Sequence, residues 1–160
     1  MAVAGDAIAG LTPLAGRRIG WRADASTTLG SGHVLRGLTL AAELAARGAA
    51  VHFVCQDLPG ELSARIRAEG HGCTLIPAHL PAAADADATG AALGGAVDAL
   101  VVDHYGLDAT WEVAMAPRAR HLIALDDLAN RPHRVHALLD QNLGREPGHY
   151  DPWLPAGAAR

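Results

Sequence analysis

The sequence contains no lysine, although 13 of its 160 residues are basic. Every basic side chain is therefore an arginine, and the chain cannot form a Schiff base through a lysine. It also cannot supply the lysine that a phosphate-binding P-loop or a protein kinase requires. These chemistries are excluded before any motif is considered.

The chain also has no excess of positive charge, since 17 acidic and 13 basic residues give a formal net charge of −4. No group of arginines is larger than the pair Arg17 and Arg18, so the basic patch typical of DNA- and RNA-binding proteins is missing. The two cysteines, Cys55 and Cys73, show no CxxC or other metal-ligand spacing. We expect both to be buried, reduced thiols of a cytoplasmic protein; the alternative is a disulfide between the two.

Long hydrophobic runs are missing too, although 50% of the residues are hydrophobic. No segment approaches the roughly 18 apolar residues that a membrane-spanning helix needs. Residues 1–17 are mostly small and apolar, but Asp6 interrupts them and no basic segment precedes them, so we expect a loose extension without an export signal. We expect one domain over residues 18–150 and the start of a linker over residues 151–160, which contain Pro152 and Pro155.

Short apolar runs alternate with helix-like stretches along this domain. Strands are predicted at residues 18–22, 51–55, 73–76, 99–102, 121–125 and 137–139, and helices at residues 34–47, 61–69 and 108–116. Residues 77–95 fit either a weak helix or a flexible connection. Because such alternation is typical of βαβ units, the sequence predicts an α/β, Rossmann-like three-layer sandwich with a mostly parallel sheet.

Residues 30–36 (GSGHVLR) place a histidine where a glycine-rich loop turns into the first predicted helix. Apolar side chains recur in this helix at three- and four-residue spacing, and Gly48 follows it where a helix-ending glycine is expected. Free backbone N–H groups and the helix dipole disfavour a positive charge at a helix N-terminus. We therefore expect His33 to be a neutral imidazole that accepts a proton; the alternative is a tight turn with a solvent-facing histidine.

Polar side chains follow four of the predicted strands, at residues 24–28, 103–105, 126–127 and 140–142. In open α/β sheets, ligands bind beyond the carboxyl ends of the strands. An aspartate in this position is also a common helix N-cap, which accounts for at least one of the four groups. Four such groups at one edge, beside the glycine loop, predict a ligand site there.

Known site types do not fit the glycine loop. A dinucleotide fingerprint requires a third glycine at position 35, where Leu35 stands, and the P-loop spacing of Gly32 and Gly37 lacks its lysine. A phosphoacceptor receiver domain also carries aspartates at strand ends, but it requires a partner lysine, which this chain does not contain. His133 and His136 lie three residues apart, but no HExxH or thiolate set accompanies them, so no metal site is predicted.

With these residues assembled, the chain resembles the N-terminal half of the PseG family. These are the UDP-2,4-diacetamido-2,4,6-trideoxy-β-L-altropyranose hydrolases of pseudaminic acid biosynthesis, relatives of the MurG-like glycosyltransferases. The family pattern R-x-D-x-S followed by G-x-G-H-x-x-R is similar to residues 22–26 and 30–36. Its D-H-Y, its paired acid and its D-x-N are similar to residues 103–105, 126–127 and 140–142, so the resemblance covers residues 18–150.

The resemblance implies the N-terminal half of a GT-B fold, whose C-terminal domain grips UDP across a cleft. It implies His33 as the catalytic base, with the Asp24 carboxylate orienting the loop or Arg36, and no cofactor or metal is expected. The implied substrate-binding residues are Asp24, Ser26, Gly30, Gly32, Arg36, Tyr105 and Asn142, and the supporting residues are Arg22, Asp103, His104, Asp126 and Asp127. The expected partners are the UDP-sugar, water and a C-terminal UDP-binding domain in cis or in trans, with no nucleic acid and no membrane.

The activity that the resemblance implies is hydrolysis at the anomeric carbon with inversion, which releases UDP and the free sugar. Inverting glycosidases ordinarily need a carboxylic acid in addition to their base. UDP is a stable anion when it leaves, so one base is enough here. Two alternatives stay open: a GT-B glycosyltransferase domain that uses an acceptor in place of water, and a non-catalytic sugar-binding half-domain.

Overall fold

The computed structural model describes residues 13–160, and residues 1–12, which include most of the expected N-terminal extension, lie outside the described part. Six strands form one sheet in the order β3-β2-β1-β4-β5-β6, and every neighbouring pair is parallel. Their bounds are β1 (Arg18–Ala23), β2 (Ala50–Gln56), β3 (Gly72–Ile76), β4 (Val97–Asp103), β5 (Ala119–Leu125) and β6 (Ala137–Leu139). The predicted Rossmann-like α/β fold is confirmed.

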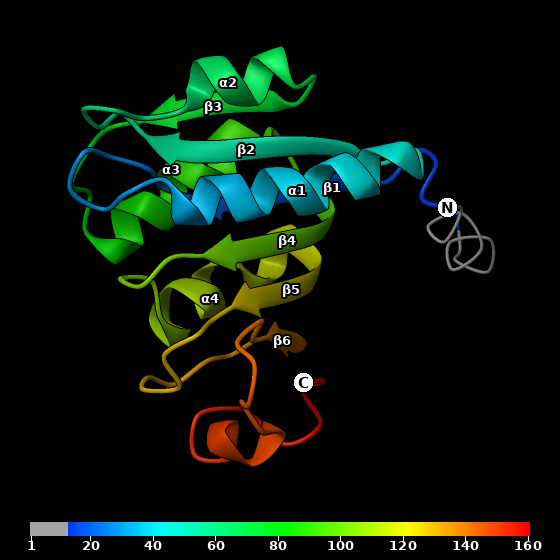
Figure 1. Cartoon of the computed structure of the whole chain (residues 1–160), viewed down its shortest axis with the longest axis vertical. Helices are drawn as coiled ribbons and strands as arrows, with labels where there is room; N and C mark the ends of the chain where they lie inside the picture. The colour runs from blue at the N-terminus through cyan, green and yellow to red at the C-terminus, as the bar shows by residue number, and fades with distance from the viewer. Residues whose placement is uncertain (1–12) are drawn as a thin grey trace.

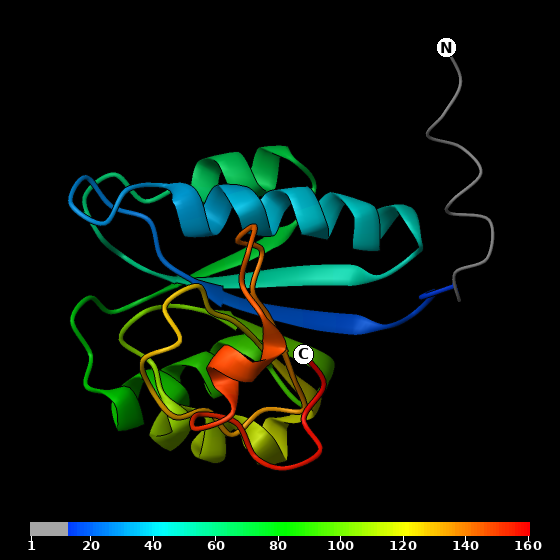
Figure 2. The ribbon, with the colours of Figure 1, turned by 60° about the horizontal axis from the view of Figure 1, so that its bottom comes forward.

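Helices cover both faces of the sheet. One face carries α1 (Gly32–Ala46) and α2 (Ser63–Ala68), and the opposite face carries α3 (Ala82–Leu93) and α4 (Ala109–Met115) (Figures 1 and 2). Residues 77–95, which fitted either a helix or a connection, thus contain α3. One buried apolar cluster lies under α1 around Trp21 and Phe53, and a second lies under α3 and α4 around Leu100 and Trp111. The three layers are held together by these two cores.

The chain on either side of the strands also packs against the domain. The N–H of Leu14 donates to the carbonyl of Arg47 at 2.9 Å. The chain also contains two 3-10 helices, η1 (Ala116–Arg118) and η2 (Pro147–Tyr150). Near its end, the N–H of Ala159 donates at 2.9 Å to the carbonyl of His136, the residue immediately before β6. Residues 151–160, for which the sequence predicts the start of a linker, therefore fold back onto the edge of the sheet.

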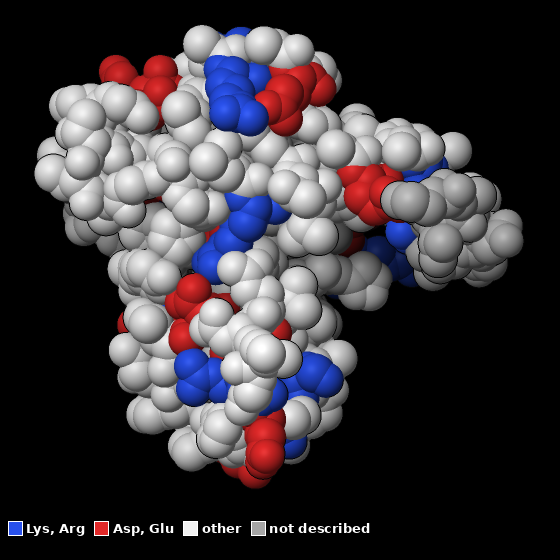
Figure 3. Space-filling model, viewed as in Figure 1, with Lys and Arg blue, Asp and Glu red and all other residues white. Residues whose placement is uncertain are grey.

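The space-filling view shows acidic and basic side chains interspersed on the face that carries α1 (Figure 3). Among the residues that the structure describes, no helix is long and apolar enough to cross a membrane.

Gly37 allows α1 to approach the sheet closely. A Cβ at this position would lie 2.7 Å from Nε1 of Trp21 and 3.2 Å from Cε1 of Phe53. The rings of Trp21 and Phe53 stack across β1 and β2 with their centroids 5.7 Å apart. Because a Cβ here would overlap the buried rings, the helix needs a residue without a side chain where it crosses them.

We expect Gly37→Ala to lower the free energy of unfolding by about 1–3 kcal/mol, the usual cost of overpacking a core, although alanine favours a helix. The measurement is urea denaturation followed by circular dichroism. The matched control is Gly32→Ala at the start of α1, where a Cβ meets no atom within 4 Å. Equal stability of the two variants would contradict the close contact at Gly37.

Candidate functional site

His33, the second residue of α1, lies beside the carboxyl end of β4. Its Nδ1 is 2.6 Å from Oδ1 of Asp103, the fully buried last residue of that strand. Because a carboxylate only accepts hydrogen bonds, the contact of 2.6 Å with Asp103 favours a proton on Nδ1 and an acceptor at Nε2. Nη2 of Arg36, a donor 3.1 Å from the same Nδ1, favours the reverse. We assign the proton to Nδ1 because the contact with Asp103 is the shorter one. No residue in the described part of the chain bonds to Nε2. The imidazole is therefore held in the tautomer that presents a free base.

Arg36, one turn further along α1, holds the same carboxylate. Its Nε donates to Oδ2 of Asp103 at 2.6 Å, its Nη2 donates to Oδ1 of Asp103, and its Nη1 donates to Oδ2 of Asp127 at 3.1 Å. The hydrogen bonds to Asp103, which outweigh burial, raise the pKa of Arg36 above its usual value. Since the guanidinium is shared between two carboxylates, Arg36 positions Asp103 and Asp127.

Tyr105 supports His33 from the other side. Its ring meets the imidazole edge to face with the centroids 4.5 Å apart, and its hydroxyl donates to Oδ2 of Asp127 at 3.3 Å. Partial burial and the Asp127 carboxylate raise the pKa of Tyr105 above 10. A closed circuit of contacts thus runs from His33 through Asp103, Arg36, Asp127 and Tyr105 back to His33.

A cavity of about 300 Å³ opens beside this circuit. Its lining residues are Leu29, Gly32, His33, Arg36, Tyr105, Asp127 and Gln141. Leu29 and Gln141 are missing from the sequence-predicted set, although Gln141 lies inside the polar group at residues 140–142. One oxygen of Asp127, Oδ1, is buried and has no hydrogen-bond partner among the described residues. The group that the cavity offers to a ligand is therefore Nε2 of His33.

Ser26 and Gly30 shape the loop before α1. Their backbones exchange two hydrogen bonds, at 3.2 and 2.9 Å, and Oγ of Ser26 accepts the N–H groups of Thr28 and Leu29. Gly30 has a φ of +79°, a left-handed conformation that favours glycine. Both residues, implied as substrate-binding, present the first turn of α1 and do not line the cavity.

Asp24 belongs to a buried ion cluster on the α3 side of the sheet. The guanidinium of Arg22, itself fully buried, donates to both oxygens of Asp24 at 2.6 and 3.0 Å and to both oxygens of Asp85 on α3 at 3.0 and 2.6 Å. Burial opposes ionisation of Asp24, but His104, Arg22 and the N–H of Gln56 outweigh it and hold the pKa of Asp24 below its usual range. Asp24 thus pairs with Arg22, makes no hydrogen bond to Arg36 among the described contacts, and does not line the cavity.

His104 links this cluster to the turn after β4 that carries Tyr105. Its Nε2 lies 3.1 Å from Oδ2 of Asp24, and its Nδ1 accepts the N–H of Gly106 at 2.9 Å. Tyr105 lies between His104 and Gly106 in the sequence. The Arg22 and Asp24 pair therefore acts on the site indirectly, by fixing the turn that carries Tyr105.

A second buried network lies at the end of β5. Nδ1 of His133 is 2.6 Å from Oε1 of Glu112 on α4, and its Nε2 is 3.9 Å from Oδ2 of Asp126, too far for a hydrogen bond. Asp126 also accepts the N–H of Ala129 and a hydrogen bond from Arg131. Burial alone would lower the pKa of His133, but the carboxylates of Asp126 and Glu112 raise it above 6.5.

Asp127 follows Asp126 directly, and two further side chains hold its backbone. Nη2 of Arg145 donates to the carbonyl of Asp127 at 2.7 Å, and the amide of Asn142 donates to the same carbonyl at 3.4 Å. Asn142, implied as substrate-binding, is exposed and contacts the backbone beside the cavity. In this structure, its side chain helps to hold the backbone of Asp127 in place.

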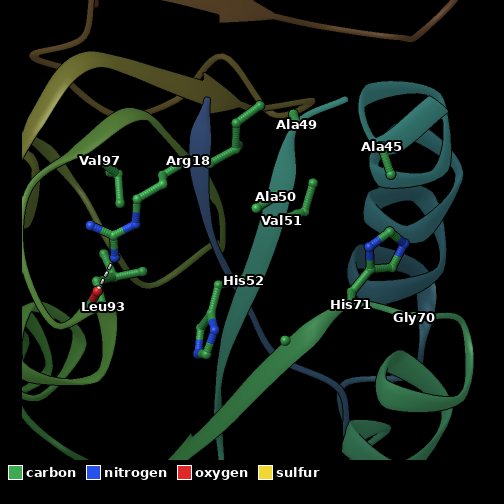
Figure 4. A pocket seen from close by; sticks show the side chains of 12 residues that line it. Arg18, Ala45, Ala49, Ala50, Val51, His52, Gly70, His71, Leu93 and Val97 are labelled. Atoms are coloured by element: carbon green, nitrogen blue, oxygen red, sulfur yellow. Dashed lines mark hydrogen bonds between the residues drawn. The ribbon is translucent and has the colours of Figure 1, made fainter. Parts of the chain in front are cut away.

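A further cavity of about 320 Å³ lies at the opposite, amino-terminal edge of the sheet. Figure 4 shows that Arg18 and His71 extend to different sides of β2. Arg18 donates to the carbonyls of Leu93 and Ala96 at 2.6 and 3.0 Å, and Nε2 of His52 lies 2.8 Å from Oγ1 of Thr74. Arg18 and His52 thus bond within the protein, and Arg18 and His71 diverge, so we do not take this cavity as the candidate site.

Within residues 13–160, no group of three or more His, Cys, Asp or Glu side chains is arranged to hold a metal ion. No protein-family model matches the chain, and no curated protein matches it significantly.

The raised pKa of His133 predicts a pH-dependent stability. A group whose pKa is higher in the folded state stabilises the fold fully below its unfolded value of 6.5, and this contribution is lost as the pH rises through the folded-state pKa. We expect the difference in unfolding free energy between the wild type and His133→Gln to be largest near about pH 6 and to shrink at higher pH. The measurement is urea denaturation across a pH series.

His121→Gln is the control for this series, because His121 is exposed on β5 and pairs with no carboxylate of the described chain. A stability difference for His133→Gln that is constant or grows with pH would contradict the assigned ion pairs.

Proposed function

We propose that this chain is the catalytic-base domain of a hydrolase that cleaves UDP-linked 2,4-diacetamido-2,4,6-trideoxy-hexoses, as the resemblance to the PseG family implies. The observation that carries the proposal is the His33 and Asp103 pair, whose 2.6 Å contact leaves Nε2 of His33 free beside a cavity of about 300 Å³. This cavity lies at the carboxyl edge of a parallel sheet, where α/β proteins bind their ligands.

In the proposed reaction, Nε2 of His33 takes a proton from a water molecule as the oxygen attacks the anomeric carbon. The bond between this carbon and the UDP oxygen breaks, and UDP leaves as an anion with the bonding electrons. The imidazolium that forms is stabilised through Nδ1–H by the carboxylate of Asp103. No acid is needed for the leaving group, so a single base fits the chemistry.

The charges around the cavity support a UDP site on another domain. The guanidinium of Arg36, the one arginine in the cavity lining, already donates to Asp103 and Asp127. A diphosphate placed here would meet two carboxylates and would have to displace them from Arg36. We infer that a C-terminal domain, in cis or in trans, binds UDP, and that this domain faces the sugar and the water.

The free thiols agree with the cytoplasmic location that we infer for this activity. Cys55 is buried as the sequence predicts, and Cys73 is only half-buried; neither forms a disulfide.

We expect His33→Asn to lower the rate of UDP release by about 10²-fold or more, the usual scale of general base catalysis. The assay measures UDP released from the UDP-sugar by a protein that joins this domain to a UDP-binding domain. Asp103→Asn removes the negative charge that stabilises the imidazolium and favours a proton on Nδ1, so it should lower kcat with little change in KM. Asp98→Asn, the same substitution at the opposite end of β4, is the matched control and should leave the rate unchanged.

Unchanged turnover in His33→Asn would contradict the assignment of the base. UDP release that requires an added sugar or lipid acceptor would identify a glycosyltransferase, and sugar binding without UDP release would identify a non-catalytic half-domain.

A further inference from the structure

The cavity beside His33 contains two side chains that the proposed base catalysis does not use. Among the described residues that line it, Leu29 is the one aliphatic side chain and Gln141 is the one side-chain amide. The other polar side chains of the lining already bond to one another or to Asp103, in the circuit around His33. Leu29 and Gln141 are therefore the groups that remain for recognising a ligand.

Leu29 is held in place by the loop that leads into α1. Its N–H donates to Oγ of Ser26 at 2.9 Å, and the backbones of Ser26 and Gly30 pair on either side of it. The N–H of Thr27 donates to the carbonyl of Pro59 at 2.8 Å, which ties this loop to the chain after β2. The Leu29 side chain is nevertheless 55% exposed. The loop thus fixes the position of an apolar side chain that the fold itself leaves uncovered.

Gln141 reaches the cavity from the chain after β6. It is exposed, and within residues 13–160 no group bonds to its side-chain amide. The neighbouring Asn142, which the family resemblance implies as substrate-binding, donates its amide to the carbonyl of Asp127 at 3.4 Å instead. A side-chain amide carries two N–H donors and one carbonyl acceptor. Gln141 therefore offers a ligand both a donor and an acceptor.

An acetamido group has the features that match this pair of side chains. It consists of an apolar methyl, a carbonyl that accepts a hydrogen bond and an N–H that donates one, and it carries no charge. Leucine removes the methyl from water, and the glutamine amide can donate to the carbonyl or accept from the N–H. A hydroxyl in its place would leave Leu29 without an apolar partner, and a phosphate would bring a charge that neither side chain neutralises.

We propose that Leu29 and Gln141 form the subsite of the His33 cavity that recognises an acetamido substituent of a sugar. Leu29 covers the methyl, and Gln141 hydrogen-bonds the amide of the substituent. This inference rests on the proposed function in one respect, because it takes a sugar to be the ligand of the cavity. Both residues determine specificity, and neither takes part in the proton transfer to His33.

The test is an NMR titration of the ¹⁵N-labelled 160-residue chain with glucose, N-formylglucosamine and N-acetylglucosamine. These sugars differ by one feature at a time, since the second adds the amide and the third adds the methyl. We expect the amide to increase the affinity about 2- to 10-fold, the net contribution of one hydrogen bond. We expect the methyl to increase it roughly fourfold further.

Each variant should remove one step of this series. In Leu29→Ala, the gain from the methyl should be lost while the gain from the amide remains. In Gln141→Ala, the gain from the amide should be lost while the gain from the methyl remains. The matched control is Leu143→Ala, because Leu143 is fully exposed and does not line the cavity. This variant should keep both gains.

Equal affinity for the three sugars, no binding of N-acetylglucosamine, or an unchanged series in either cavity variant would overturn the acetamido subsite. Such a result would leave the assignment of the base to its own test with His33→Asn, because the titration does not measure UDP release. Conversely, a chain that shows the expected series, and whose fusion to a UDP-binding domain releases no UDP, would retain the subsite and contradict the hydrolysis.

Discussion

The buried carboxylate of Asp103 is the contact on which the candidate site depends. It ends a central strand of the sheet and is bonded by both His33 and Arg36 from α1. An unpaired carboxylate at this depth would be costly, and the guanidinium of Arg36 offsets that cost by donating to both oxygens. The imidazole of His33 shares Oδ1 with Nη2 of Arg36. The same guanidinium reaches Asp127 beyond β5, so one arginine sets the distance between the helix and two strand ends.

Two buried ion networks flank this contact and hold the turns around it. On one side, Arg22 joins β1 to α3 through Asp24 and Asp85, and His104 extends this network to the turn after β4. On the other side, His133 joins the chain after β5 to α4. Breaking such a pair leaves an uncompensated charge in the core, so the turns that place Tyr105 and Asp127 are rigidly specified.

The sequence predicts the strands and α1 because their apolar patterns are local. It leaves α3 open, because an alanine-rich segment with aspartates has no apolar stripe, and Asp85 is buried only through the distant Arg22. The strand-end residues are predictable as a group, since parallel strands end at one edge. Their individual roles cannot be predicted from the sequence, because Asp24 and Asp103 both follow a strand there. They are distinguished by the arginine that each pairs with in the fold, Arg22 for Asp24 and Arg36 for Asp103. Gln141 enters the cavity for a similar reason, through the path of the chain after β6.

The central claim is that Asp103 fixes His33 with its proton on Nδ1 and its free base on Nε2. ¹⁵N NMR of the imidazole in the intact chain at neutral pH measures this directly. Our account predicts a protonated Nδ1 and an unprotonated Nε2 in the wild type, and a mixture of both tautomers in Asp103→Asn. A proton on Nε2 of the wild type, or the same spectrum in both proteins, would contradict it.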